Sequence, residues 1–191
     1  TGFGSAGGKV RVVKTASAAF EAEHVILAAG AFTPSVVHDL KLNIPIQSAR
    51  GYSMTMSATK QMPRHALVLG ERRIVISPLG NLLRFTGRLE VGNDNMTPNP
   101  IWIQRIENSA REYIMVDEKL DIKETWAGLR PVTPDGMPII GHSPHHSNLI
   151  FATGHAMLGL SLGPGTGQVV AELINGQATA FDLSPLSLNR F

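Results

Sequence analysis

Alternating polar and apolar residues, and short unbroken apolar runs, predict β-strands in the first third of the chain. Residues 9–14 alternate between the two kinds, as a half-buried strand does. Residues 22–30 predict a second strand, and its wholly apolar part at 25–29 indicates burial on both faces. A short helix is predicted over 34–40, with Thr33 as its N-cap.

The middle of the chain predicts an antiparallel meander followed by a helix. Residues 44–57 alternate again, and three short strands at 66–69, 74–77 and 82–86 are separated by turn residues. A helix is predicted over 100–116 because apolar residues recur there at helical spacing. These residues are Ile103, Ile106, Ala110 and Ile114.

The last third returns to strands at 122–129 and 149–152, then to a helix over 165–175 that Gly176 ends. Strands at both ends therefore bracket a largely antiparallel middle. This order is expected when the chain leaves one domain, forms a second domain and then returns to the first. We expect an α+β or α/β fold with divisions at 1–43, 44–130 and 131–191.

Composition excludes several classes of function. The chain has 191 residues, a net charge of +2 and mixed charges, whereas a nucleic-acid surface needs a concentrated positive stripe. It has no cysteine, which excludes disulfides, thiolate zinc sites and cysteine nucleophiles. It begins at Thr1 in a loop beside a predicted strand, so we expect it to be a piece of a longer protein.

Two glycine patterns resemble known motifs without meeting their physical requirements. Gly2–Gly7 has the spacing of a dinucleotide fingerprint, but that motif must open a helix, and here it precedes a strand; a hairpin loop is expected instead. Gly159–Gly163 has the spacing of a nucleophile elbow around Ser161. That fold places its histidine after the serine, and no histidine follows His155.

The histidines do not predict a metal site. His142, His145 and His146 lie in a Pro/Ser-rich loop without cysteine or a nearby carboxylate at ligand spacing, so solvated loop residues are expected. His155 lies inside a Gly-rich segment. We expect it to have a structural role or to lie at the edge of a cofactor.

Arg130 carries the most chemical weight. It follows an apolar strand and precedes Pro131, which favours an extended or turn backbone at the arginine. A guanidinium held there can bind a carboxylate through two parallel hydrogen bonds. The alternative is a structural arginine paired with an acid such as Glu90 or Asp135.

Four segments together resemble one family, the D-amino acid oxidase superfamily of FAD-dependent amine oxidoreductases. They are residues 25–34, 46–53, 126–141 and 152–167. The nearest branch is bacterial D-amino acid dehydrogenase, which shares Arg-Gly-Tyr-Ser and Trp-x-Gly-Leu-Arg-Pro-x-Thr-Pro-Asp-Gly. The resemblance implies the C-terminal half of a two-domain flavoprotein. Residues 1–43 would end its FAD-binding domain, 44–130 would form the substrate domain, and 131–191 would return to the FAD domain with a C-terminal helix.

The resemblance also implies a cofactor, FAD, and residues that contact it. Ala29 and Gly30 would lie near its ADP part and Gly51 near the isoalloxazine. The segment His155–Ser161 would wrap the pyrimidine end. Its members are His155, Ala156, Met157, Leu158, Gly159, Leu160 and Ser161.

The implied substrate is a small D-amino or imino acid whose carboxylate Arg130 binds. Glu90, Tyr52 and Met157 complete the expected substrate-binding set. Met157 stands where glycine-oxidase-like relatives have a second arginine, so anchoring would depend on Arg130. Glu90 is acidic at the end of a meander strand and would tune substrate choice, the alternative being a solvated strand-end residue.

The implied chemistry is hydride transfer from the substrate Cα to flavin N5, with no catalytic side chain and no metal. The isolated chain is expected to be inactive without the FAD-binding half that the resemblance implies. Oxygen or a quinone at a membrane surface would accept the electrons, and the expected location is cytoplasmic or peripheral to a membrane. The alternatives are a non-catalytic binding or structural domain, and a serine hydrolase based on Ser161.

Overall fold

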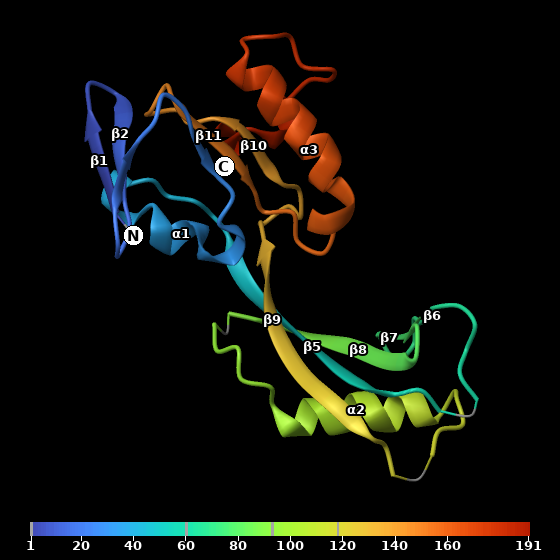
Figure 1. The fold of residues 1–191 in the computed structure, drawn as a ribbon. Coiled ribbons are helices and arrows are strands. Elements are labelled where there is room, and N and C mark those ends of the chain that lie inside the picture. The colour runs from blue at the N-terminus through green and yellow to red at the C-terminus, as the bar shows by residue number, and fades with distance from the viewer. Residues whose placement is uncertain (1, 60, 93, 118) are drawn as a thin grey trace. The chain divides into compact units, whose positions relative to one another are not determined.

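The computed structural model describes residues 2–59, 61–92, 94–117 and 119–191. Thr1, where the first expected division begins, lies outside them. The chain forms two compact units (Figure 1). The first unit consists of Thr1–Gln47 and Arg130–Phe191, and the second unit of Ser48–Leu129.

The first unit begins with a three-stranded antiparallel sheet of order β1-β2-β3. Its strands are β1 (Gly2–Ala6), β2 (Lys9–Lys14) and β3 (Ala19–Glu21). Gly2 and Gly4 lie within β1, while Gly7 and Gly8 form the turn at φ +59° and +69°, a left-handed backbone that glycine adopts without strain. The expected hairpin is present, but its glycines belong partly to a strand. No helix follows them, so the rejection of the dinucleotide fingerprint stands.

The first unit also contains a sheet of order β10-β11-β4. Its strands are β10 (Ile139–His142), β11 (Leu149–Thr153) and β4 (Val25–Leu27), with β4 parallel to β11 and β10 antiparallel to it. Phe151, Ile139 and Leu149 lie at the centre of its core. The prediction that 25–29 is buried on both faces is wrong for this structure. The strand ends at Leu27, and Ile26 is 40% exposed.

Two helices of the first unit differ from the predicted boundaries. Helix α1 spans Thr33–Val36 and is followed by a 3-10 turn at His38–Leu40. Thr33 is not its N-cap, because its buried hydroxyl hydrogen-bonds Thr153 of β11 at 2.9 Å. Helix α3 spans Gly159–Ile174, so it begins six residues earlier than predicted and continues through Pro164, which offers no backbone N–H to the preceding turn.

The second unit is a five-stranded sheet with one helix. The strands are β5 (Gln47–Ser57), β6 (Leu67–Leu69), β7 (Ile74–Leu79), β8 (Leu82–Val91) and β9 (Ile122–Val132), in the order β6-β7-β8-β5-β9. The pairs β6–β7, β7–β8 and β8–β5 are antiparallel. The predicted mixed α+β architecture with a largely antiparallel middle sheet is thus confirmed.

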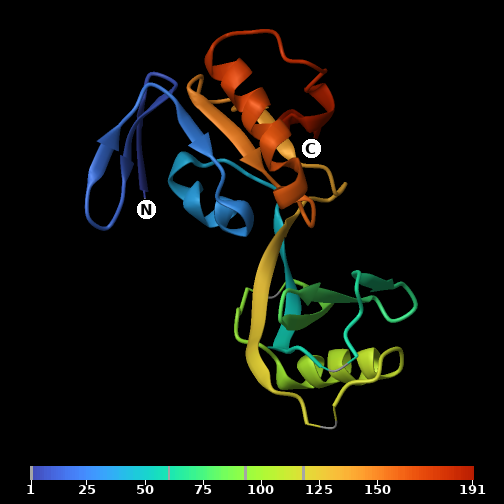
Figure 2. The ribbon, with the colours of Figure 1, turned by 45° about the vertical axis from the view of Figure 1, so that its right-hand side comes forward.

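Helix α2 (Pro100–Arg111) covers one face of this sheet (Figure 2). It begins where predicted because the Asn99 side chain accepts a hydrogen bond from the Ile101 backbone N–H at 3.0 Å, a standard N-cap. Its periodic residues Ile103, Ile106 and Ala110 are buried against the sheet. The helix ends at Arg111, five residues before the predicted end. Among the described residues, no helix is both long and apolar enough to cross a membrane.

Candidate functional site

Arg130 is a half-buried cation on β9 in the first unit. Among the described residues no hydrogen bond or ion pair reaches its guanidinium. The two acids considered as structural partners are engaged elsewhere, since Asp135 pairs with Arg190 and Glu90 with Arg50. Burial lowers the pKa of Arg130 because loss of water disfavours a charge that nothing compensates. The surroundings therefore favour an anionic ligand at this position.

The connection from β11 to α3 is tied to β9 beside Arg130. The Ala156 backbone N–H donates to the carbonyl of Pro131 at 3.0 Å. Gly154 lies so close to Thr133 that an added Cβ would stand 2.9 Å from its Cγ2. Gly154 and Ala156 have φ values of +77° and +46°. The connection is thus held in one tight shape next to the end of the strand.

The same connection and the first turn of α3 expose a continuous apolar segment. Met157, Leu158 and Leu160 are 74%, 56% and 96% exposed, respectively. Gly159, which lies between them, and Ser161, which follows Leu160, are exposed as well. Exposed apolar side chains that are adjacent in this way make the segment a candidate surface for a ligand or partner.

His155 belongs to this segment but is held from within the fold. Its Nε2 lies 2.9 Å from Oγ1 of Thr166 on α3. Burial lowers the pKa of His155, so its imidazole is neutral at pH 7. The geometry suits a positioning residue at the edge of a ligand more than an acid or base.

Ala29 and Gly30 follow β4, at the end of the sheet where β11 also ends. Gly30 has a φ of +55°, and a Cβ added to it would meet nothing within 4 Å. Its carbonyl accepts a hydrogen bond from Oγ1 of Thr153 at 3.4 Å. Open backbone at a strand end allows close approach of another group.

Glu90, in the second unit, is the acceptor at the centre of a side-chain network. Its Oε2 accepts hydrogen bonds from Nε and Nη2 of Arg50, at 3.1 and 2.8 Å, and from the hydroxyl of Tyr52. Its Oε1 accepts from Nε1 of Trp102 at 2.8 Å. The hydrogen bond from Tyr52, followed by those from Arg50, lowers the pKa of Glu90 to about 2. Glu90 is therefore an ionised, partly buried anchor, and the alternative of a solvated strand-end residue is wrong.

Tyr52 and Gly51 have defined places in the same unit. Tyr52 has no exposed surface, and burial and Glu90 raise the pKa of its phenol to about 12. Gly51 is buried where the pairing of β5 with β8 shifts register, between Gly51 and Tyr52, so it marks an irregularity of the strand. The roles of Tyr52, Glu90 and Gly51 towards substrate or flavin stay predictions.

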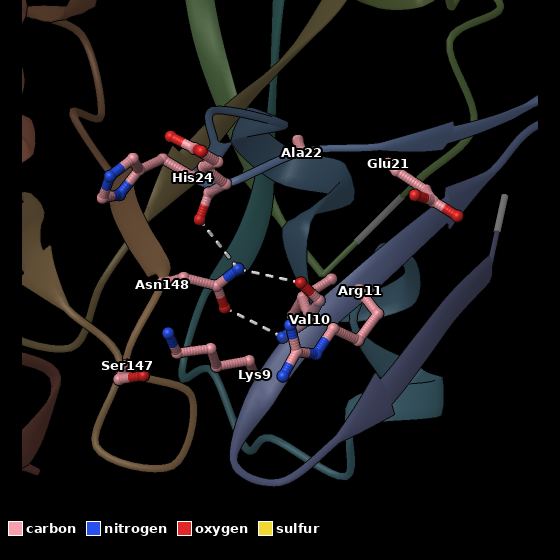
Figure 3. A pocket seen from close by; sticks show the side chains of 9 residues that line it. Lys9, Val10, Arg11, Glu21, Ala22, His24, Ser147 and Asn148 are labelled. Carbon is pink, nitrogen blue, oxygen red and sulfur yellow. Dashed lines mark hydrogen bonds between the residues drawn. The ribbon is translucent and has the colours of Figure 1, made fainter.

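None of these residues lines a cavity of about 730 Å³ that lies in the first unit. Figure 3 shows it between β2, residues 21–24 and Ser147–Asn148. The Asn148 amide accepts from the Val10 N–H at 2.8 Å and donates to the carbonyls of Val10 and Glu23 at 2.8 and 3.1 Å. Because this buried amide already has its partners within the chain, it fastens β2 to the neighbouring loop and is not displayed to a ligand.

A smaller cavity, of about 300 Å³, lies within the second unit. Its lining is Ser53, Arg84, Thr86, Glu124 and Trp126. Sequence reasoning assigned none of these residues to a site. The alternation of these residues with core residues along β5, β8 and β9 could have predicted that they share the opposite face of the sheet.

The alternatives based on histidine and serine gain no support. The described residues contain no cluster of three or more potential metal ligands. The expectation that His146 is a solvated loop residue is wrong, since the residue is only 8% exposed. Ser161 lies inside α3, and five residues separate the end of β11 from the first residue of that helix, whereas the nucleophile elbow is a sharp strand-to-helix turn.

The first unit provides features that fit part of FAD. The exposed apolar segment at 157–160 suits a flat ring, and the open backbone at Gly30 permits close approach. Helix α3 is 16 residues long, so its N-terminus carries partial positive charge. The glycines of β1 and its turn open no helix and do not supply a diphosphate site. The first unit therefore suits the ring end of FAD at 157–160 and the close approach of the cofactor at the end of β4.

Comparison with known proteins gives a consistent result. The family model described as FAD dependent oxidoreductase matches residues 1–173. A D-amino acid dehydrogenase from Paramagnetospirillum magneticum is 36% identical over 187 residues, which cover 97% of this chain and 44% of that protein. The chain thus spans less than half the length of this curated relative.

Solved structures share the fold along the whole chain. Glycine oxidase from Geobacillus kaustophilus has a TM-score of 0.88 and 27% identity, covering 100% of this chain and 51% of that one. L-proline dehydrogenase from P. horikoshii has a TM-score of 0.85 and 21% identity, covering 100% and 53%.

Proposed function

The chain belongs to the family of FAD-dependent oxidoreductases, and on this basis we propose that the full-length protein oxidises the Cα–N bond of a small D-amino or imino acid. The name of the relative from Paramagnetospirillum supports the substrate class. The observation that carries the proposal is Arg130, a half-buried cation that has no counter-ion among the described residues.

Arg130 binds the substrate carboxylate in this proposal. Its guanidinium offers parallel N–H groups that match the two carboxylate oxygens, and its backbone is fixed by the neighbouring Pro131. One bidentate contact leaves a small amino acid little rotational freedom, so the Cα–H is presented in one direction. Such orientation supplies a large part of the rate of a bound reaction.

The connection from β11 to α3 contributes the cofactor surface. The chemistry that bound FAD would supply is acceptance of a hydride from Cα, while the amine lone pair forms the imine. Met157, Leu158 and Leu160 exclude water from the ring when they are covered, and the N-terminus of α3 favours negative charge beside it. Ala156, Gly159 and Ser161 present backbone, and neutral His155 orients the edge of the ring.

We propose different roles, cofactor binding and substrate binding, for two parts of the chain. We assign 1–43 and 131–191 to the FAD-binding domain and 44–130 to the substrate domain. The units of the structure divide instead after Gln47 and after Leu129, so they differ from this assignment by four residues and one residue and place Arg130 in the first unit.

Ala29 and Gly30 then serve the ADP part of the cofactor. Gly51 and Met157 remain the proposed contacts to flavin or substrate in addition to Arg130. Tyr52, which has no exposed surface, and Glu90, which Tyr52 and Trp102 bind, are proposed to influence substrate choice through this network and not by contact.

The test is reduction of the cofactor in the full-length protein. Purified protein should show the absorbance bands of bound flavin, and anaerobic addition of a D-amino acid should bleach them, with the imino acid product hydrolysing to a 2-oxo acid. The L-enantiomer serves as the matched control. A protein that binds FAD but is bleached by no amino or imino acid would refute the proposed activity.

A further inference from the structure

Helix α2 and strand β8 lie side by side in the second unit (Figure 1), and each contributes an arginine that lies over the same indole. The Cζ atom of Arg88, on β8, is 3.7 Å from the centroid of the Trp102 ring, and the Cζ atom of Arg105, on α2, is 4.6 Å from it. The two guanidinium carbons are therefore within about 8 Å of each other, close to the Debye length at physiological salt. Both residues are exposed, so the pair concentrates positive charge at one place on the surface.

Neither guanidinium has a negative partner in the part of the chain that the structure describes. No hydrogen bond or ion pair reaches either of them. Strand β8 and helix α2 contain one acid each, and both acids are engaged elsewhere. Glu90 pairs with Arg50, and Glu107 pairs with Arg111. The repulsion between the two unpaired cations is therefore left uncompensated, which favours the binding of an anion.

Trp102 holds both arginines in place. Its Nε1 donates to Oε1 of Glu90 at 2.8 Å, and its ring packs at the border of the core, so the indole has a fixed orientation. A guanidinium that contacts a ring through its face keeps its N–H groups free, because they lie in its own plane. Contact with the ring also restricts these long side chains before a ligand arrives, so less conformational entropy is lost on binding.

Arg88 owes its position to a β-bulge. In the pairing of β5 with β8, Gly51 is opposite Leu89 and Tyr52 is opposite Gly87, so Arg88 is the extra residue. Its φ is +63°, a left-handed conformation that costs a residue other than glycine free energy. Bulges redirect side chains and are frequent beside functional sites. A strained backbone that carries an unpaired cation to an indole is evidence for a role beyond stability.

We propose that Arg88 and Arg105 together bind a phosphate group, either of a soluble phosphate ester or of an anionic lipid. One guanidinium already matches the two oxygens of a carboxylate, whereas the negative charge and the several oxygens of a phosphate can engage two. Ile101, one helical turn before Arg105 on α2, is 60% exposed and would contact the ligand only if acyl chains accompany the phosphate. The inference goes beyond the proposed oxidation and does not depend on it.

The test is calorimetric titration of the FAD-loaded full-length protein at low ionic strength. Pyrophosphate is the soluble probe, vesicles of phosphatidylglycerol with phosphatidylcholine are the lipid probe, and pure phosphatidylcholine vesicles are the blank. The wild type should bind at least one probe, and added salt should weaken binding. Arg88→Gly and Arg105→Gln should each weaken it by about tenfold or more. Arg88→Gly should fold, because glycine adopts this φ without strain.

The Ile101→Ser variant distinguishes the two sources of phosphate. Vesicle binding that this variant weakens assigns the site to an anionic lipid. Pyrophosphate binding that it leaves unchanged, with vesicles that do not bind, assigns the site to a soluble ester. Both results support a phosphate site at Arg88 and Arg105.

A matched control is available in the same unit. Arg64 is exposed and lies in the loop before β6, where no interaction with a ring or an acid reaches it among the described residues. Arg64→Gln should change the affinities by less than about twofold. An equal loss in Arg64→Gln would show that net charge alone attracts the probes and would overturn the proposal. A wild type that binds neither probe, or Arg88→Gly and Arg105→Gln that bind as the wild type does, would overturn it too, while oxidation of amino acids is measured separately.

Discussion

Arg190 donates two hydrogen bonds to the carboxylate of Asp135, from Nε to Oδ2 at 2.7 Å and from Nη2 to Oδ1 at 3.2 Å. The same Nη2 donates to the carbonyl of Met137 at 2.8 Å, and Thr133 donates its hydroxyl to that carbonyl at 2.7 Å. The turn that follows β9 is thus closed from both sides. Asp135, one suggested partner of Arg130, instead holds the residues near the end of the chain.

We expect Asp135→Asn to change the acid stability of the first unit. The hydrogen bond from Arg190 lowers the pKa of Asp135 below its unfolded value of about 3.9. The pair therefore stabilises the fold above that pH, and the contribution is lost as pH falls through the folded pKa. Urea titrations from about pH 6 to pH 2.5 should show a steeper loss for the wild type than for Asp135→Asn. Parallel curves would contradict this account.

Arg130→Ala should reduce kcat/KM by roughly thirty-fold to a thousand-fold, because a bidentate contact in a water-poor site contributes on the order of 2–4 kcal/mol. Arg130→Lys should recover only part, since an ammonium is a point charge without the planar fork. The measurement is steady-state kinetics of the full-length enzyme, with the flavin spectrum recorded to confirm bound FAD. Near-normal kcat/KM in the alanine variant would return Arg130 to a structural role.

Tyr52→Phe should lower the free energy of unfolding by about 1 kcal/mol, since it removes one donor from Glu90 and keeps the ring. Glu90→Gln should cost more, because Arg50, whose side chain is 5% exposed, would lose its carboxylate. Chemical denaturation of both variants tests this order. The same proteins test the substrate role predicted for Glu90. If relative kcat/KM across several D-amino acids is unchanged in Glu90→Gln, the network serves the fold alone.

His146 should make stability depend on pH near neutrality. It is buried, and in the described structure its Nδ1 has no hydrogen-bond partner. Burial, and then the neighbouring His145, lower the pKa of His146. Stability is therefore full above the unfolded pKa of about 6.5 and falls as pH drops below it, because the unfolded chain takes up a proton that the fold resists.

Replacement of His146 by Gln should flatten the melting temperature between about pH 7.5 and pH 5.5. The exposed His65, which is far from His146 in the sequence, provides the control, since His65→Gln should keep the slope. Equal slopes in wild type and His146→Gln would show that other groups set the pH dependence.

Local patterns predicted the elements that packing reinforces. Ile103, Ile106 and Ala110 were recognised by spacing because one sheet face buries them. The prediction of Thr33 as an N-cap was wrong because its hydroxyl hydrogen-bonds Thr153, a residue distant in the sequence. The start of α3 was missed because Gly159–Gly165 looks like a loop, although the fold continues the helix through it.

The candidate site was predictable only in part. Arg130 was identified by its neighbours in the sequence, but its lack of a counter-ion could not be, since the two acids considered as partners, Asp135 and Glu90, pair with Arg190 and Arg50. The packing of Trp126 on Gly128 joins two positions on one strand face. Their spacing is visible in the sequence, but the direction of the indole is not.

Ala156 illustrates how a site can be prepared before its ligand arrives. Its φ of +46° costs an alanine free energy that a glycine would not need, yet an alanine also has fewer alternative shapes in the unfolded chain. The free-energy cost of this backbone conformation is therefore incurred during folding, and the hydrogen bond to Pro131 helps to offset it. A cofactor that meets a loop already in its final shape has less disorder to remove, so more of its contact energy can appear as affinity.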